Sequence, residues 1–173
     1  MTKLFLSLHV IAAVLAIGPV TIVASMFPKA LRRAHAAPGD REAYAALRLL
    51  HRICRVYAGV GIAVPVFGFA TASSLGVLGS AWLIVSILLT AAAAAVLVLL
   101  ILPAQARALA TVSALEPGAG GLATVSSPEP GAGGEASVHR VAGRLAMLTG
   151  VFNLLWATVT VLMIIRPGST TGA

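Results

Sequence analysis

Long apolar stretches alternate with short polar ones along this chain. The pattern predicts four helices, at residues 4–27, 53–75, 80–102 and 141–165. Each stretch contains the roughly twenty apolar residues that a helix needs to cross a bilayer. Between residues 53 and 102 the only charged side chain is Arg55, and a turn at residues 75–80 divides the two stretches. Lipid offers no partners to backbone polar groups, so each pass must be a helix or part of a closed barrel. We therefore expect an all-α, integral membrane four-helix bundle that forms one domain over residues 1–173.

Composition and charge narrow the class of protein. The chain is 59% hydrophobic and 10% charged, whereas about a quarter of the residues in a soluble domain are charged. The net charge is +7, but the basic residues flank apolar stretches and form no stripe with interleaved aromatic residues, so nucleic acid is not an expected partner. The expected partners are the lipid bilayer and its anionic headgroups. The single cysteine, Cys54, excludes an internal disulfide and gives no metal-binding spacing.

The distribution of Lys and Arg predicts an orientation. Lys3 and Arg166 lie at one end of the predicted bundle, and the other ten Lys and Arg residues lie in or beside the two long connections. The positive-inside rule then places both connections in the cytoplasm and both termini outside. A cleaved signal peptide ending near residues 22–24 is the alternative. The positive charges that follow it closely disfavour that alternative, because translocated segments normally avoid them.

The first long connection is predicted to contain an amphipathic helix. Pro38 and Gly39 break the chain, and Asp40 is suited to cap a helix N-terminus. The helix is expected to lie in the membrane interface and to run directly into the second span. The basic residues of one face are expected to anchor it to lipid headgroups by snorkelling. These anchoring residues are Arg48, Arg52 and Arg55. Recognition of a lipid phosphate or of a partner's acidic surface is the alternative.

The second long connection contains a tandem repeat. Residues 109–121 read LATVSALEPGAGG and residues 122–134 read LATVSSPEPGAGG, with differences only at positions 114/127 and 115/128. Units rich in Gly, Pro and Ser cannot form a core. We expect a flexible cytoplasmic linker over about residues 104–138, with docking of a partner as the alternative.

The fourth span carries small and polar residues at spacings of three, four, three, four and three. They are Gly143, Ala146, Gly150, Asn153, Ala157 and Thr160. Helices in lipid associate through close packing of small residues and interhelical hydrogen bonds, so this face is predicted to pack against another helix. The first span offers a matching face with His9, and antiparallel packing would pair His9 with Thr160. Other membrane subunits or a second copy of the chain are further partners.

His9 is the one residue inside the predicted spans that invites chemistry. An ionisable group in a membrane is a functional hypothesis, and a neutral imidazole can bind haem. Met163 is the only residue predicted at the same depth that could serve as a second ligand. The predicted spans contain no Asp, Glu or Lys for a proton relay. We predict no catalytic residue and no metal site.

Residues 8–18, LHVIAAVLAIG, resemble the first-helix signature of small bacterial integral membrane proteins of unknown function. These are distantly similar to the copper-resistance D and HemJ-like protoporphyrinogen oxidase membrane families, which read Leu-His, an apolar stretch and then Trp-x-Gly. His9 and Gly18 match that pattern, and Ala16 stands where the Trp would be. Residues 28–31, PKAL, resemble the Pro-Arg-x-Leu of the HemJ-like group, about one helical turn later. The resemblance implies a four-helix core and, by analogy, association with haem or copper.

Two departures from these families affect what the resemblance implies. The HemJ-like proteins use a lysine on a later helix, and no lysine follows Lys29 in this chain. Copper handling favours clusters of Met and His, and the four methionines are scattered. Only His9 is therefore carried over, as a ligand for haem.

The sequence as a whole predicts a multi-pass protein of a bacterial cytoplasmic membrane. We expect it to be a non-catalytic accessory or structural membrane subunit that packs through small-residue faces. A haem-binding redox protein that uses His9 is the first alternative. A small transporter that uses helices kinked at Pro19 and Pro65 is the second.

Overall fold

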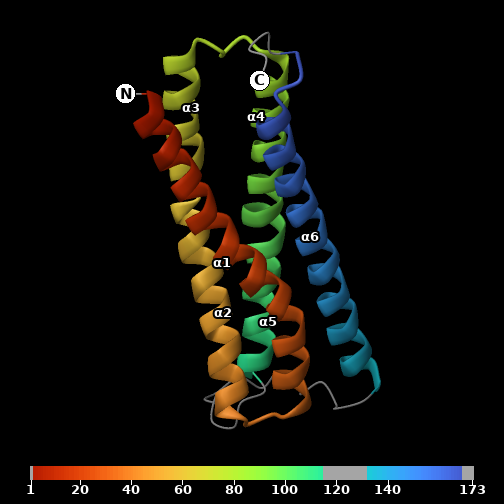
Figure 1. The fold of residues 1–173 in the computed structure, drawn as a ribbon. Helices are drawn as coiled ribbons and strands as arrows, with labels where there is room; N and C mark the ends of the chain where they lie inside the picture. The colour runs from red at the N-terminus through yellow and green to blue at the C-terminus, as the bar shows by residue number, and fades with distance from the viewer. Residues whose placement is uncertain (1, 115–131, 169–173) are drawn as a thin grey trace.

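The computed structural model describes residues 2–114 and 132–168, and every regular element within these ranges is a helix. The elements are α1 (Thr2–Ala36), α2 (Arg41–Val60), α3 (Ala63–Leu75), α4 (Ala81–Ala95), the π-helix η1 (Val96–Ile101), α5 (Leu102–Ala114) and α6 (Ala132–Ile165). Helices α2 and α3 stack end to end, as do α4, η1 and α5, so the chain forms four rods (Figure 1).

All four rods are long and apolar enough to cross a membrane. They comprise Thr2–Ala36, Arg41–Leu75, Ala81–Ala114 and Gly134–Ile165. This confirms the predicted all-α architecture with four such helices. The rods extend beyond the predicted boundaries at the basic end of the bundle, because the segments there are rich in Ala, Lys and Arg, which favour helix.

Helical structure also enters both ends of the range in which a linker is predicted. Helix α5 continues to Ala114, and α6 begins at Ala132. The predicted flexible linker spans about residues 104–138, so its two flanks are helical. Residues 115–131, which hold most of the tandem repeat, lie outside the described part of the chain.

Proline marks the two places where a rod changes its helical pattern. At the α2–α3 junction the N–H of Val64 donates to the carbonyl of Gly61 at 3.2 Å, and Pro65 has no N–H that could continue the regular ladder to Gly61. The second rod therefore breaks one turn before Pro65. In the third rod, η1 ends at Ile101, two residues before Pro103. A wider π-turn accommodates a ring that would clash with the carbonyl four residues earlier.

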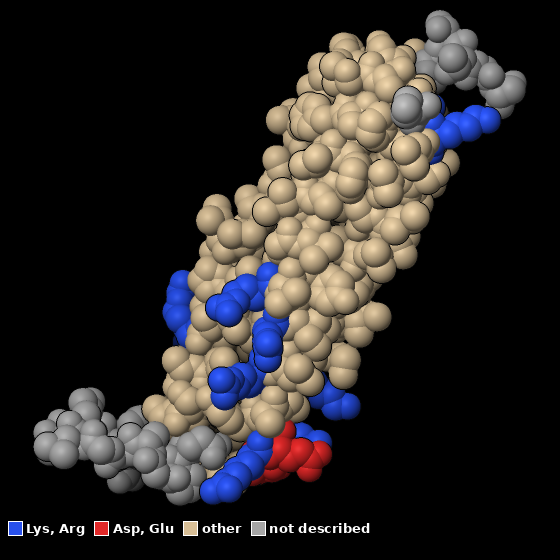
Figure 2. All heavy atoms as spheres, turned by 90° about the vertical axis from the view of Figure 1, so that its left-hand side faces the viewer, with Lys and Arg blue, Asp and Glu red and all other residues tan. Residues whose placement is uncertain are grey.

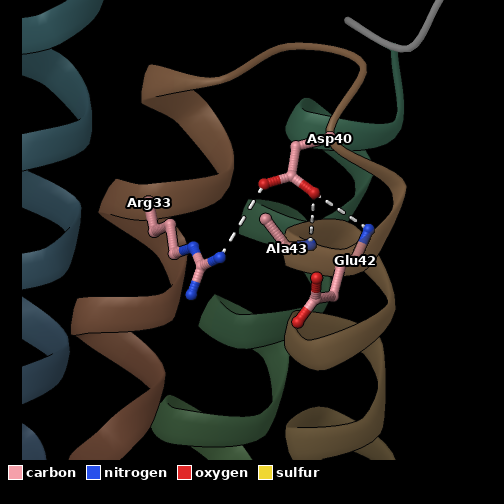
Figure 3. A network of polar contacts seen from close by, with 4 residues as sticks. All are labelled: Arg33, Asp40, Glu42 and Ala43. Carbon is pink, nitrogen blue, oxygen red and sulfur yellow. Dashed lines mark hydrogen bonds and ion pairs between the residues drawn. The ribbon is translucent and has the colours of Figure 1, made fainter.

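The helix predicted in the first connection forms with the predicted cap. One carboxylate oxygen of Asp40 accepts hydrogen bonds from the backbone N–H groups of Glu42 at 3.0 Å and Ala43 at 3.1 Å (Figure 3). The position of this helix differs from the predicted one, in which it lies along the membrane interface. Helix α2 stands within the bundle in line with α3 (Figure 1), because its apolar face packs against α1 and α5, where Leu47 and Cys54 are fully buried.

Helix α1 is the centre of the packing. It contacts α2, α3, α5 and α6 and crosses the other rods obliquely (Figure 1). The main core lies around its C-terminal half, where the largest fully buried side chains gather: Phe27, Leu31, Leu47, Ile101 and Leu145. Towards the other end α3 packs against α1 and α4 packs against α6, while α3 and α4 stand apart. The bundle is therefore tight at its basic end and more open at the opposite end.

Candidate functional site

His9 contacts the third helical element of the chain. Its Nδ1 lies 2.9 Å from the carbonyl oxygen of Val64 on α3. A backbone carbonyl only accepts hydrogen bonds, so Nδ1 is the donor in this contact. The ring lies over Gly68, where an ideal Cβ would be 3.0 Å from His9 Cε1. A glycine thus provides the space that brings α1 and α3 together at this point.

The expected pairing of His9 with Thr160 is not what the structure shows. The hydroxyl of Thr160 donates to the carbonyl of Trp156 in its own helix at 2.9 Å, and its side chain faces outward. A threonine in a helix can satisfy its hydroxyl four residues back. Helix α3 offers His9 both a carbonyl acceptor, at Val64, and space, at Gly68. His9 and Thr160 therefore each have a hydrogen-bond partner without pairing with each other.

The expectation that His9 and Met163 hold a haem stays a prediction from the sequence. Met163, the expected second ligand, lies near the C-terminal end of α6, next to Arg166, whose guanidinium is 5.8 Å from the ring centre of Trp82 on α4. His9 contacts α3. It lines neither the cavity beside Leu31 and Val112 nor the one beside Pro65 and Trp156. Within residues 2–114 and 132–168, no group of three or more His, Cys, Asp or Glu residues could hold a metal ion. We derive no haem chemistry from this arrangement.

The small-residue stripe of α6 lies mostly on the outside of the chain. Gly143, Ala146, Gly150, Ala157 and Thr160 are exposed, and Asn153 is half-buried. An ideal Cβ at Gly143 or Gly150 would have no neighbour within 4 Å. Helix α6 packs inward through other residues, among them Ala142, Leu145, Thr149, Phe152 and Val159. Within the described chain no helix covers the exposed members of the stripe.

The predicted anchoring residues, Arg48, Arg52 and Arg55, are all exposed on α2. Figure 2 shows most Lys and Arg side chains gathered over the lower part of one face, with Asp and Glu at its lower end. The C-terminal end of α1 and the N-terminal end of α2 meet at that end of the bundle (Figure 1). The ten basic residues of the two long connections thus lie towards one end, as their positions in the sequence predict.

A buried polar cluster was not predicted. Gln105 on α5 is completely buried, and its Oε1 lies 3.2 Å from Nδ1 of His51 on α2. Its Nε2 donates to the sulfur of Cys54 at 3.9 Å. The cluster joins α2 to α5. The predicted third span ends at residue 102, so the prediction places Gln105 in the linker. Continuing the helical spacing of the preceding apolar residues would have included Gln105 in the helix.

A cavity of about 380 Å³ lies between the rods where α3 and α4 separate. Its lining is mostly aliphatic and aromatic, with Ala16 of α1, Pro65 of α3, Leu97 of η1 and Trp156 of α6 among the contributors. Among the described residues, Arg55 is the only charged one that lines it. No single stretch of sequence indicates this cavity, because four rods contribute to it.

Comparison of the chain with protein-family models, with curated proteins and with solved structures gives no match. The resemblance of residues 8–18 to the copper-resistance D and HemJ-like families therefore stays an expectation from sequence.

Proposed function

We propose that this protein is a non-catalytic accessory or structural subunit of a bacterial cytoplasmic membrane, and that it associates with a second membrane helix through the small-residue stripe of α6. The observation that supports this most is the exposure of that stripe. Its glycines at 143 and 150 leave open space where a neighbouring backbone could approach closely. Close approach of backbones is what drives association of helices in lipid.

A second copy of the chain is the partner that this face fits best. The stripe repeats at spacings of three and four residues, so the same face of another α6 can pack against it about a two-fold axis. Asn153, the half-buried member of the stripe, has its Oδ1 buried within the protomer without a hydrogen-bond partner among the described residues. The exposed members of the stripe are therefore the ones available to the second copy.

Energy transfer between donor-labelled and acceptor-labelled copies in lipid vesicles tests the association. We expect transfer in the parent protein and an approximately tenfold weaker association in Gly150→Leu, which is about 1.4 kcal/mol. Val151→Leu, which enlarges an exposed residue of α6 outside the stripe, is the matched control and should leave transfer unchanged. Equal transfer in the parent and in Gly150→Leu would overturn the proposed interface.

The proposed orientation has both termini outside the cell. In support, the basic residues of the two long connections lie towards one end of the bundle (Figure 2). Single cysteines at Leu78, in the turn before α4, and Ser137, in the first turns of α6, test it in a Cys54→Ser background. An impermeant maleimide should label Leu78→Cys in intact cells and Ser137→Cys only after lysis. The reverse pattern would invert the orientation.

A further inference from the structure

The α2–α3 junction and the separation of α3 from α4 create the cavity of about 380 Å³. Gly59 and Gly61 line it without side chains, and the wide turn of η1 contributes Leu97 and Val98 on the opposite wall. An ideal Cβ at Gly59 would meet nothing within 4 Å. The cavity therefore results from breaks in two neighbouring rods, and it is not simply a gap between straight helices.

The volume and lining of the cavity fit a hydrocarbon chain. Pockets for small molecules have volumes of about 300–1,000 Å³ and are mainly apolar. Among the lining residues, Thr90 has a hydroxyl that already donates to the carbonyl of Ser86 at 2.7 Å. The buried indole N–H of Trp156 has no hydrogen-bond partner among the described residues. An apolar cavity that opens to the side of a bundle in lipid is filled by acyl chains more readily than by water.

Arg55 adds a positive charge to the lining of this mostly apolar cavity. Arg48 and Arg52 lie on the same helix and do not line the cavity, whereas Arg55 does. Among the described residues the ion pair found is that of Arg33 with Asp40, so the structure gives Arg55 no carboxylate partner there. A guanidinium matches phosphate oxygens in charge and geometry. A positive group beside an apolar cavity suits an amphiphile with an anionic head.

We propose that the cavity binds one anionic phospholipid, with its phosphate at Arg55 and an acyl chain between the α2–α3 junction, η1 and Trp156. This rests on the membrane residence assumed in the proposed function, and it does not depend on association through α6. It assigns to Arg55 a role beyond general anchoring and separates it from Arg48 and Arg52.

Quenching of tryptophan fluorescence by brominated acyl chains tests the proposal. The chain has two tryptophans, so Trp82→Phe leaves Trp156, which lines the cavity, as the reporter. The protein is reconstituted in phosphatidylcholine vesicles in which a minor share of the lipid is brominated phosphatidylglycerol or brominated phosphatidylcholine. We expect half-maximal quenching at an approximately fivefold lower share of the anionic lipid.

Two pairs of variants make the test specific. Arg55→Gln should abolish the preference for the anionic lipid, whereas Arg52→Gln, which changes a neighbouring exposed arginine, should keep it. Gly59→Leu fills the cavity and should reduce quenching by both lipids. Gly18→Leu adds the same side chain at an exposed position of α1 that is outside the lining, and it should have no effect.

Equal quenching by the two lipids in the parent protein would overturn the proposal and leave only unselective lipid contact. Unchanged preference in Arg55→Gln would overturn the role of Arg55, and unchanged quenching in Gly59→Leu would overturn the position of the chain. Failure of the α6 association shows in the energy-transfer experiment instead. A protein that does not reconstitute into vesicles would remove the membrane residence on which both proposals rest.

Discussion

The imidazole of His9 lies directly over Gly68, so close that an ideal Cβ at that residue would be 3.0 Å from His9 Cε1 and 3.2 Å from Nδ1. The same ring donates a hydrogen bond to the carbonyl of Val64 at 2.9 Å. Both contacts join α1 to α3 in the more open half of the bundle. They explain His9 as a packing residue that ties two helices together.

The contact predicts a strong coupling between residues 9 and 68. Gly68→Ala should displace the ring and weaken its hydrogen bond, lowering the free energy of unfolding by about 1–3 kcal/mol. In a His9→Ala background the added methyl group has room, and the same substitution should have little effect. Unfolding in mixed detergent micelles of the parent, both single variants and the double variant gives the coupling energy.

Gly18→Ala is the control for this cycle. Its Cβ would meet no atom within 4 Å, so the substitution should be neutral or stabilise the helix by up to about 1 kcal/mol. If Gly68→Ala destabilised the protein equally with and without His9, the ring would not be the group that needs the space.

The sequence predicts the four helices because lipid leaves the backbone few alternatives. It does not predict the partner of His9, since a backbone carbonyl and a missing side chain on another helix leave no complementary residue to recognise. It also does not predict the outward position of the α6 stripe. Periodicity shows that Gly143 and Gly150 share a face, but not which neighbour, if any, the face meets.

The features that were not predicted from the sequence lie at the ends of helices or at breaks within them. Gln105 falls just beyond the apolar stretch that predicts the third span, yet it is completely buried, because Arg and Ala residues continue the helix to Ala114. The cavity depends on breaks in two rods, at the α2–α3 junction and at η1. Pro65 and Pro103 predict irregularity there, but not that the two irregularities face each other.

The buried cluster around Gln105 predicts the reactivity of the single cysteine. Cys54 is completely buried beneath Gln105, so N-ethylmaleimide should label the folded protein slowly. Gln105→Ala removes the covering amide and leaves His51 without its partner. If the free energy of the local opening that exposes the thiol is then about 2 kcal/mol lower, labelling should be about thirtyfold faster. The measurement is the labelling rate by mass spectrometry in detergent.

Thr111→Ala serves as a matched substitution on α5, because the hydroxyl of Thr111 is exposed and donates within its own helix to the carbonyl of Arg107. It should leave the labelling rate of Cys54 unchanged. A rate in Gln105→Ala equal to that of the parent would show that Gln105 does not protect the thiol.

Asp40 makes two kinds of contact, and they predict different effects on stability. Its carboxylate caps α2 through two backbone N–H groups, at 3.0 and 3.1 Å, and pairs with Arg33 at 4.0 Å (Figure 3). Loss of a carboxylate cap costs about 1 kcal/mol, whereas an exposed ion pair contributes about 0–1 kcal/mol. Because the Arg33 side chain is 67% exposed, the contribution of the ion pair should lie at the lower limit.

Asp40→Ala should therefore lower the free energy of unfolding by about 1 kcal/mol, and Asp40→Asn, which keeps a capping oxygen, by much less. Arg33→Gln should be nearly neutral, and high salt should change none of these differences. A large effect of Arg33→Gln that disappears in salt would instead assign the stabilisation to the ion pair.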